Sequence, residues 1–165
     1  MQALLYHRYA PKMYGVCLRY ASCADEANDM LQEGFIKIFS RINSYRGDGP
    51  LEAWMRRIIT NTAIEHLRKK TYMQPITETE EDTIEDNDLS VLDTLSQKDI
   101  INLIQTLPTG YRTVFNLKEL EGHTHKEIAK LLDISEGTSK SQFSRARMIL
   151  QEKVKTYLDK RKTAP

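Results

Sequence analysis

Apolar residues recur every three or four positions through the N-terminal part of the chain, and this spacing predicts three amphipathic helices. The expected helices cover residues 4–21, about 25–42 and about 50–70. Pro11 predicts a kink or a late start in the first helix. Ser22 or Asp25 is expected to cap the second helix, and Pro50 suits the first turn of the third.

The helical period is lost over residues 73–95, which are polar and acidic and predict a flexible linker. The period resumes near Ser96, and helix breaks are expected at Pro108 and Gly122. No internal repeat and no strand pattern is present. The fold class is therefore expected to be all-α. We expect an N-terminal domain (1–72), the linker (73–95) and a C-terminal domain (96–165).

The strongest local pattern lies in residues 124–148. Thr124 and Glu127 match a capping box at the start of a short helix. Asp133 to Ser135 predict a tight turn, and Ser135 is positioned to cap a long final helix. A short helix, a turn and a longer helix form a helix-turn-helix unit, in which the second helix enters the major groove of DNA.

The second helix of this unit carries polar side chains that can donate to base edges or phosphates. The positions expected to face outward are Thr138, Lys140, Ser141, Ser144, Arg145 and Met148. Lys126, Lys130 and Lys153 are expected to contact the DNA backbone. The alternative is an ordinary helical hairpin with a solvated basic face. The pattern favours DNA binding.

Charge is distributed unevenly, although the net charge is only +1. Residues 73–95 hold 8 acidic and no basic side chains, whereas residues 46–72 hold 6 basic and 3 acidic ones. Residues 136–162 hold 8 basic and 3 acidic side chains. Two basic segments that flank an acidic one indicate contact with nucleic acid through the basic parts.

The third predicted helix combines cations with an aromatic side chain, which suits unpaired DNA. Its cations are Arg56, Arg57, Arg68, Lys69 and Lys70, and its aromatic residue is Trp54. In the simpler interpretation the cations are only solvated and Trp54 belongs to the core. For Trp54 we favour the core.

The sequence gives little indication of disulfide bonds, membrane segments, metal sites or catalysis. Cys17 and Cys23 form no CxxC pattern, which favours a reduced cytoplasmic protein. No apolar run is long enough to span a membrane, and the N-terminus does not match a signal peptide. His123 and His125 are two apart and do not share a helix face, so no metal is expected there. We expect no cofactor and no enzymatic activity.

Four segments of the chain form a recognisable set: DEANDMLQEGFIKIF (25–39), SYRGDG (44–49) with AWMRRIITNTAIEHLR (53–68), LEGHTHKEIA (120–129) and ISEGTSKSQFSRAR (134–147). Together they resemble the extracytoplasmic-function sigma factors, which recruit bacterial RNA polymerase to promoters. They follow the order found in that family, on either side of an acidic linker.

The resemblance implies partners and roles for particular residues. The β′ clamp of core polymerase would be contacted or framed by Asp29, Gln32, Glu33 and Phe35. The −10 element would be bound by Arg56, Arg57, Asn61, Glu65, Arg68 and Lys69. The −35 element would be bound by Lys126, Thr138, Lys140, Ser141, Ser144 and Arg145. The family also implies contact with the polymerase β flap, an anti-sigma factor as a partner, and no membrane insertion.

Three departures from the family pattern have structural consequences. The family has further residues before the segment that begins at Leu4, so a shortened or missing first helix is expected. Asp133 stands where the turn often has glycine, which costs little because Asp tolerates the left-handed region. Ser139 replaces an apolar residue and is expected to loosen the packing of the recognition helix.

Two alternatives remain open at the level of sequence. A response-regulator effector would share the helix-turn-helix but would need strands and a phosphate pocket in its other domain. A sigma-like decoy would bind polymerase or an inhibitor without supporting initiation.

Overall fold

The computed structural model describes residues 1–71 and 95–163, and every regular element in these residues is helical. The chain divides into two compact units, Met1–Ile76 and Thr77–Pro165, which are described separately below. The all-α prediction is confirmed. The predicted linker, residues 73–95, lies outside the described residues except for Leu95, which is buried.

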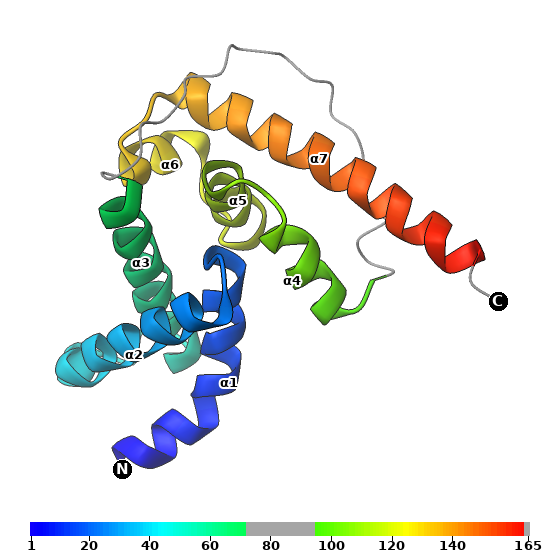
Figure 1. The fold of residues 1–165 in the computed structure, drawn as a ribbon. Helices are drawn as coiled ribbons and strands as arrows, with labels where there is room; N and C mark the ends of the chain where they lie inside the picture. Colours follow the sequence, from blue (N-terminus) through cyan, green and yellow to red (C-terminus); the bar gives the residue numbers. More distant parts are fainter. Residues whose placement is uncertain (72–94, 164–165) are drawn as a thin grey trace. The chain divides into compact units, whose positions relative to one another are not determined.

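The N-terminal unit is a three-helix bundle in which each helix contacts the other two (Figure 1). Its elements are α1 (Gln2–Tyr20), α2 (Ala24–Arg41), the 3₁₀ turn η1 (Ile42–Ser44) and α3 (Leu51–Thr71). The core is built from apolar side chains at helical spacing, among them Met13, Val16, Tyr20, Met30, Leu31, Ile38, Met55, Ile59 and Ala63. Burying each large side chain of this kind stabilises the fold by about 1.5–3 kcal/mol. The three predicted helices are confirmed, and in the residues described here no strand supports a response-regulator domain.

Two predictions about helix ends in this unit are wrong. Helix α1 continues through Pro11, so of the two effects expected of this proline, a kink or a late start, the late start is wrong. The N-cap position of α2 is Cys23, and no side chain caps the helix there. The carboxylate of Glu26 instead folds back and accepts a hydrogen bond from the backbone N–H of Ser22.

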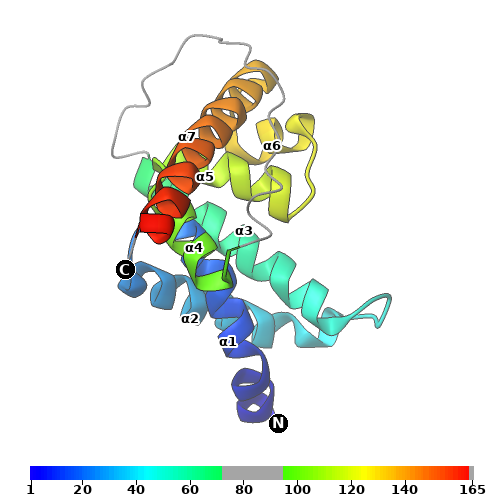
Figure 2. The ribbon, with the colours of Figure 1, turned by 90° about the vertical axis from the view of Figure 1, so that its right-hand side faces the viewer.

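The C-terminal unit is organised around one long helix, α7 (Glu136–Thr163), against which the other helices pack (Figure 2). The other elements are α4 (Gln97–Gln105), α5 (Thr109–Phe115), the π-helical segment η3 (Asn116–Leu120) and α6 (His125–Leu132). The core residues include Ile104, Leu107, Val114, Phe115, Leu117, Ile128, Phe143, Ala146, Leu150 and Val154. This core fixes the angle at which α6 and α7 meet.

The helix expected between the breaks at Pro108 and Gly122 is not regular throughout, since its last part is the π-helical segment η3. In η3 the N–H of Glu121 donates to the carbonyl of Asn116 at 3.0 Å, which is the wider i to i+5 spacing of a π-helix. Gly122 then ends the segment with φ +74°, a value that glycine adopts without strain. The predicted helix end at Gly122 is confirmed.

Candidate nucleic-acid interface

Helix α6 begins with a complete capping box. The N–H of Glu127 donates to the Thr124 hydroxyl at 3.2 Å, and the Glu127 carboxylate accepts from the N–H of Thr124 at 2.7 Å. The bond from the Thr124 N–H to this carboxylate, with a second one from the Thr124 hydroxyl at 2.9 Å, holds the pKa of Glu127 below its ordinary value. The predicted capping box is confirmed, and it fixes the start of the first helix of the helix-turn-helix.

The turn between α6 and α7 is built by two residues. Asp133 has φ +55° and ψ +49°, the left-handed conformation that ends α6. Ser135 caps α7, since its hydroxyl accepts from the N–H of Thr138 at 2.9 Å and lies 2.8 Å from the Thr138 hydroxyl. Both predictions are confirmed, and the second helix follows the first after a three-residue turn.

The first turns of α7 present a polar surface that contains cations. Lys140 is exposed and its ammonium lies 3.0 Å from the Glu136 carboxylate, one turn earlier on the helix. Thr138, Ser144 and Arg145 are partly exposed. On α6, Lys126 is exposed. Side chains of this kind can donate to guanine or to phosphate at a major groove.

Ser141 does not belong to this exposed surface. It is 8% exposed, and its hydroxyl donates to the carbonyl of Thr138 at 3.1 Å. The prediction that Ser141 faces outward is wrong, because its hydroxyl is already engaged within its own helix.

Ser139 lies on the inner side of α7 and is completely buried. Its hydroxyl lies 2.9 Å from Nδ1 of His125, the first residue of α6. The expected loosening at this position is therefore offset, since a hydrogen bond between the two helices replaces the apolar contact. Sequence spacing did not reveal this pair, because the two residues lie on different helices.

An aromatic cluster extends the contact between α6 and α7. The His125 ring meets the edge of Phe143 at a centroid distance of 5.6 Å, and Phe143 stacks on Phe115 at 6.2 Å. Burial and the nearby cations of Lys118 and Lys140 hold the pKa of His125 below its ordinary value, although Glu136 opposes this shift. The neutral imidazole is therefore the form that the folded unit favours.

In the N-terminal unit, one exposed face of α3 carries four polar side chains at spacings of four, four and three. They are Arg57, Asn61, Glu65 and Arg68, and we call them the α3 stripe. All four are exposed, as expected of residues that contact a ligand. Lys69 is also exposed and Arg56 is partly exposed. The structure therefore brings most of the predicted −10 residues onto one surface.

The loop before α3 is pinned by Tyr45. Its hydroxyl donates to the carbonyl of Gly49, and its ring lies 5.5 Å from the ring of Trp54. Trp54 is partly exposed, so it is neither a fully buried core residue nor a free stacking platform. The pair holds the loop 46–50 in place at the start of α3.

Helix α2 presents a second exposed face. Asp29 and Gln32 are exposed, and Ile36 follows them on the same side with 68% of its surface exposed. A single exposed isoleucine is normal on a protein surface, and here it adds apolar area to a face that is otherwise polar. Ile36 was missed in the sequence because three of its four neighbours at helical spacing, Gln32, Glu33 and Ser40, are polar.

Phe35 is not part of this face. It is 2% exposed and packs against Tyr6 at a centroid distance of 4.7 Å. The prediction that Phe35 contacts a partner directly is therefore wrong. Phe35 can only support the exposed face of α2 from inside the bundle. Glu33 is partly exposed and pairs with Lys37 at 3.0 Å.

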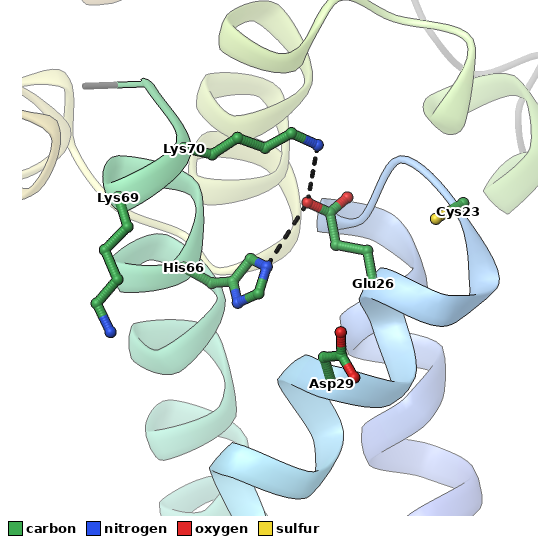
Figure 3. A pocket seen from close by; sticks show the side chains of 6 residues that line it. All are labelled: Cys23, Glu26, Asp29, His66, Lys69 and Lys70. Carbon is green, nitrogen blue, oxygen red and sulfur yellow. Dashed lines mark hydrogen bonds and ion pairs between the residues drawn. The ribbon is translucent and has the colours of Figure 1, made fainter. Parts of the chain in front are cut away.

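A small open pocket joins the start of α2 to the end of α3 (Figure 3). At its centre Glu26, which is 8% exposed, lies 3.1 Å from Nζ of Lys70 and 3.7 Å from Nε2 of His66. Burial alone would raise the pKa of Glu26. The hydrogen bonds from Ser22 and Lys70, with the charge of Lys70, outweigh burial and hold the pKa below its ordinary value.

Two further classes of site, a membrane-spanning helix and a metal centre, are absent from the described part of the chain. No helix there combines the length and apolar character needed to cross a bilayer. Within residues 1–71 and 95–163, no group of three or more His, Cys, Asp or Glu side chains is arranged to hold a metal ion.

Comparison with known families gives the class of this protein. The model described as Sigma-70 region 2 matches residues 5–72, and the model described as Sigma-70, region 4 matches residues 89–150. The first covers the three-helix unit, and the second covers the helix-turn-helix. The two units therefore belong to the sigma-70 class of RNA polymerase factors.

Curated relatives narrow this class. The chain is 30% identical over 163 residues to the ECF RNA polymerase sigma-E factor of Haemophilus influenzae, covering 92% of this chain and 86% of that protein. It is 31% identical over 167 residues to the RNA polymerase sigma-H factor of Pseudomonas aeruginosa, covering 94% and 86%. The chain belongs to the extracytoplasmic-function (ECF) family of RNA polymerase sigma factors.

A solved structure supports the fold. The sigma factor RpoE of Bartonella quintana, crystallised with the anti-sigma factor NepR, is similar with a TM-score of 0.53 and 22% sequence identity. The match covers 93% of this chain and 96% of that chain. As a member of the ECF family, the chain directs RNA polymerase to promoters, with core RNA polymerase and promoter DNA as its partners.

Proposed function

We propose that the two units divide promoter recognition between them. The N-terminal unit, residues 1–72, docks on core polymerase and captures the −10 element as its strands separate. The C-terminal unit, residues 96–165, reads the duplex −35 element. Residues 73–95 join the two units. The observation that carries this proposal is the capped helix-turn-helix, whose second helix begins with an exposed polar surface.

The −35 contact is assigned to side chains that the structure leaves accessible. These are Lys126, Thr138, Lys140, Ser144 and Arg145. Ser141 is omitted because it is buried. Lys140→Ala and Arg145→Ala are each expected to weaken −35-dependent binding by about 1–3 kcal/mol per lost base contact. The exposed Lys155, later on α7, provides the control Lys155→Ala, which should preserve base preference.

The −10 contact is assigned to the α3 stripe, with Arg56 and Lys69 beside it. Asn61 has an amide that can both donate to and accept from a base edge. Asn61→Ala is expected to reduce −10 discrimination in run-off transcription while core binding is preserved. Asn102→Ala on α4 is a matched control, because Asn102 is exposed in the other unit. Full −10 selectivity in Asn61→Ala would exclude the assignment.

The polymerase contact is assigned to the exposed face of α2, with Asp29, Gln32 and Ile36 in contact and Glu33 at its flank. The apolar side chain of Ile36 supplies area that is lost from water on binding, and its polar neighbours supply orientation. Ile36→Asp is expected to weaken core binding at least tenfold. The control is Leu4→Asp, which changes another exposed apolar residue, on α1.

Regulation by an inhibitor protein and a cytoplasmic location are also proposed for this chain. An anti-sigma factor is proposed as a further partner, as the complex of the Bartonella protein with NepR illustrates for that protein. The chain is proposed to act in the cytoplasm, where promoter DNA and polymerase meet, and to catalyse no reaction itself. Adding an anti-sigma factor should reduce run-off transcription by competing with core polymerase for the chain.

A further inference from the structure

The first residue of α6, His125, contacts two positions on the inner side of α7. Its Nδ1 lies 2.9 Å from the Ser139 hydroxyl, and its ring meets the edge of Phe143 at a centroid distance of 5.6 Å. Ser139 and Phe143 are four residues apart, so they lie on the same side of the helix, one turn from each other. Both are buried. One imidazole therefore holds the N-terminal part of α7 against α6.

This contact determines where two exposed neighbours point. Ser139 is flanked by Thr138 and Lys140, which are both assigned above to the −35 contact. Successive residues of an α-helix are rotated by about 100°, so a residue fixed on the inner side sets the direction of the residues beside it. The cap formed by Ser135 does not fix this rotation, because its bonds to Thr138 lie within the start of α7 itself. The bond to His125 joins the first turn of α7 to another helix.

Charged side chains face or flank the imidazole from three elements. They are Lys118 on η3, Lys140 and Glu136 on α7, and, next to His125 on α6, Lys126 and Glu127. Burial lowers the pKa of His125, Lys118 and Lys140 lower it further, and Glu136 opposes them. The Glu136 carboxylate lies 3.0 Å from the Lys140 ammonium, so part of its charge is already neutralised. The neutral ring is therefore the form that suits this contact.

Protonation reverses the hydrogen bond between the two helices. In the neutral ring Nδ1 can accept from the Ser139 hydroxyl, whereas in the imidazolium both nitrogens donate. The hydroxyl hydrogen of Ser139, which is completely buried, must then find another acceptor. The new charge also lies near the cations of Lys118 and Lys140. Both changes act at the contact that holds the first turn of α7.

We propose that His125 is a positioning residue for −35 recognition: the neutral imidazole, bonded to Ser139, sets the rotation of α7 that directs Thr138 and Lys140 toward base edges, and a proton on the ring disturbs this setting. The inference rests on the −35 role proposed above for α7. It adds a residue that acts through other side chains, and it makes the discrimination between bases depend on pH.

A proton on His125 affects total affinity and base discrimination differently. An imidazolium near DNA attracts phosphates whatever the sequence, and this contribution is the same for every duplex. A disturbed α7 weakens only the contacts to base edges. The quantity to measure is therefore the −35 ratio, which is the dissociation constant for a promoter with one substituted −35 base pair divided by that for the unsubstituted promoter. Phosphate attraction cancels from this ratio, and so does any fraction of unfolded chain.

The experiment uses the chain bound to core polymerase and a double-stranded promoter fragment from which the chain initiates. The −35 ratio is measured at pH 7 and at pH 5. Ser139→Ala removes the partner of the imidazole. His125→Asn keeps a hydrogen-bonding amide close to the position of Nδ1 but does not titrate. The control is His123→Gln, which removes another histidine of this segment, one that lies 3.9 Å from Glu127.

The −35 ratio of wild type should fall about fivefold from pH 7 to pH 5, the lower end of what one good base contact contributes. The direction follows from the pKa of His125, which is below about 6.5 in the folded chain, so that the ring is neutral at pH 7 and gains a proton as pH falls through the folded pKa. Ser139→Ala should have a lower ratio already at pH 7, with little further fall. His125→Asn should keep most of the ratio at both pH values, and His123→Gln should follow wild type.

The outcomes separate the inference from the proposed function. A wild-type −35 ratio of one at pH 7 would show that the proposed −35 role fails. A ratio above one that is equal at pH 7 and pH 5 would overturn the inference alone. A fall in His125→Asn as large as that in wild type would also overturn it, because another group would then carry the proton. The wild-type profile needs no substitution, so a variant that does not fold leaves the test intact.

Discussion

Removing the buried carboxylate of Glu26 should destabilise the N-terminal unit far more than removing an exposed one. Glu26 is 8% exposed, accepts the N–H of Ser22 and pairs with Lys70 (Figure 3). In Glu26→Ala the bond from the Ser22 N–H to the carboxylate is lost, whereas Lys70 is 55% exposed and stays hydrated. The cost is therefore mainly that of one hydrogen bond to a charged group, about 1.5–3 kcal/mol.

The matched control is Glu52→Ala. Glu52 also pairs with a lysine, at 2.7 Å, but both side chains are well exposed, at 43% and 62%. Exposed pairs of this kind contribute roughly 0–1 kcal/mol. The comparison therefore isolates burial and the backbone hydrogen bond from the ion pair itself.

The assay is urea unfolding of the full chain followed by tryptophan fluorescence. Trp54 is the only tryptophan and lies in the N-terminal unit, so the signal reports that unit. The pKa of Glu26 is lower in the folded state than its ordinary value. Its contribution is therefore complete above the unfolded pKa, about 4.3, and is lost as pH falls through the folded pKa. Equal losses in Glu26→Ala and Glu52→Ala at pH 7 would refute this reasoning.

Three further predictions concern packing, the turn and pH. Gly34→Ala should destabilise the N-terminal unit by about 1–3 kcal/mol in the same urea assay, because the new Cβ would overlap Cδ1 of the completely buried Ile59. A free energy of unfolding equal to that of wild type would show that the Ile59 side chain can move aside at no cost. Asp133→Gly should retain or slightly raise the melting temperature measured by circular dichroism, whereas Asp133→Val should lower it, because φ is +55°. The folded state depresses the pKa of His125, so its contribution is present above about pH 6.5 and is lost as pH falls through the folded pKa. The melting temperature of wild type should therefore fall more steeply than that of His125→Gln as pH is lowered from 7 to 5. Parallel plots of melting temperature against pH would contradict this.

Local sequence rules predicted the elements whose stabilising contacts are close in sequence. The capping box of Thr124 and Glu127, the Ser135 cap and the Gly122 helix end all depend on residues within four positions of one another. The α3 stripe follows from helical spacing alone. For these features the residue types and their separation determine the geometry.

Features that depend on tertiary contact could not be predicted in this way. The bond between His125 and Ser139 joins two helices whose crossing is set by the core, so spacing along either helix does not reveal it. The predicted cap of α2 failed because Glu26 returns to Ser22 as part of a cluster with α3. The π-helical segment that begins at Asn116 was also not predicted, because a change in backbone hydrogen bonding does not alter the spacing of apolar residues.

The most direct test of the account is run-off transcription with core RNA polymerase and a library of promoter DNA. The account predicts that the chain and core together produce a specific transcript that neither produces alone. It also predicts that Asn61→Ala alters preference only at the −10 element and Arg145→Ala only at the −35 element. A chain that binds core polymerase but initiates from no promoter, or variants that alter the opposite elements, would contradict the division of recognition between the two units.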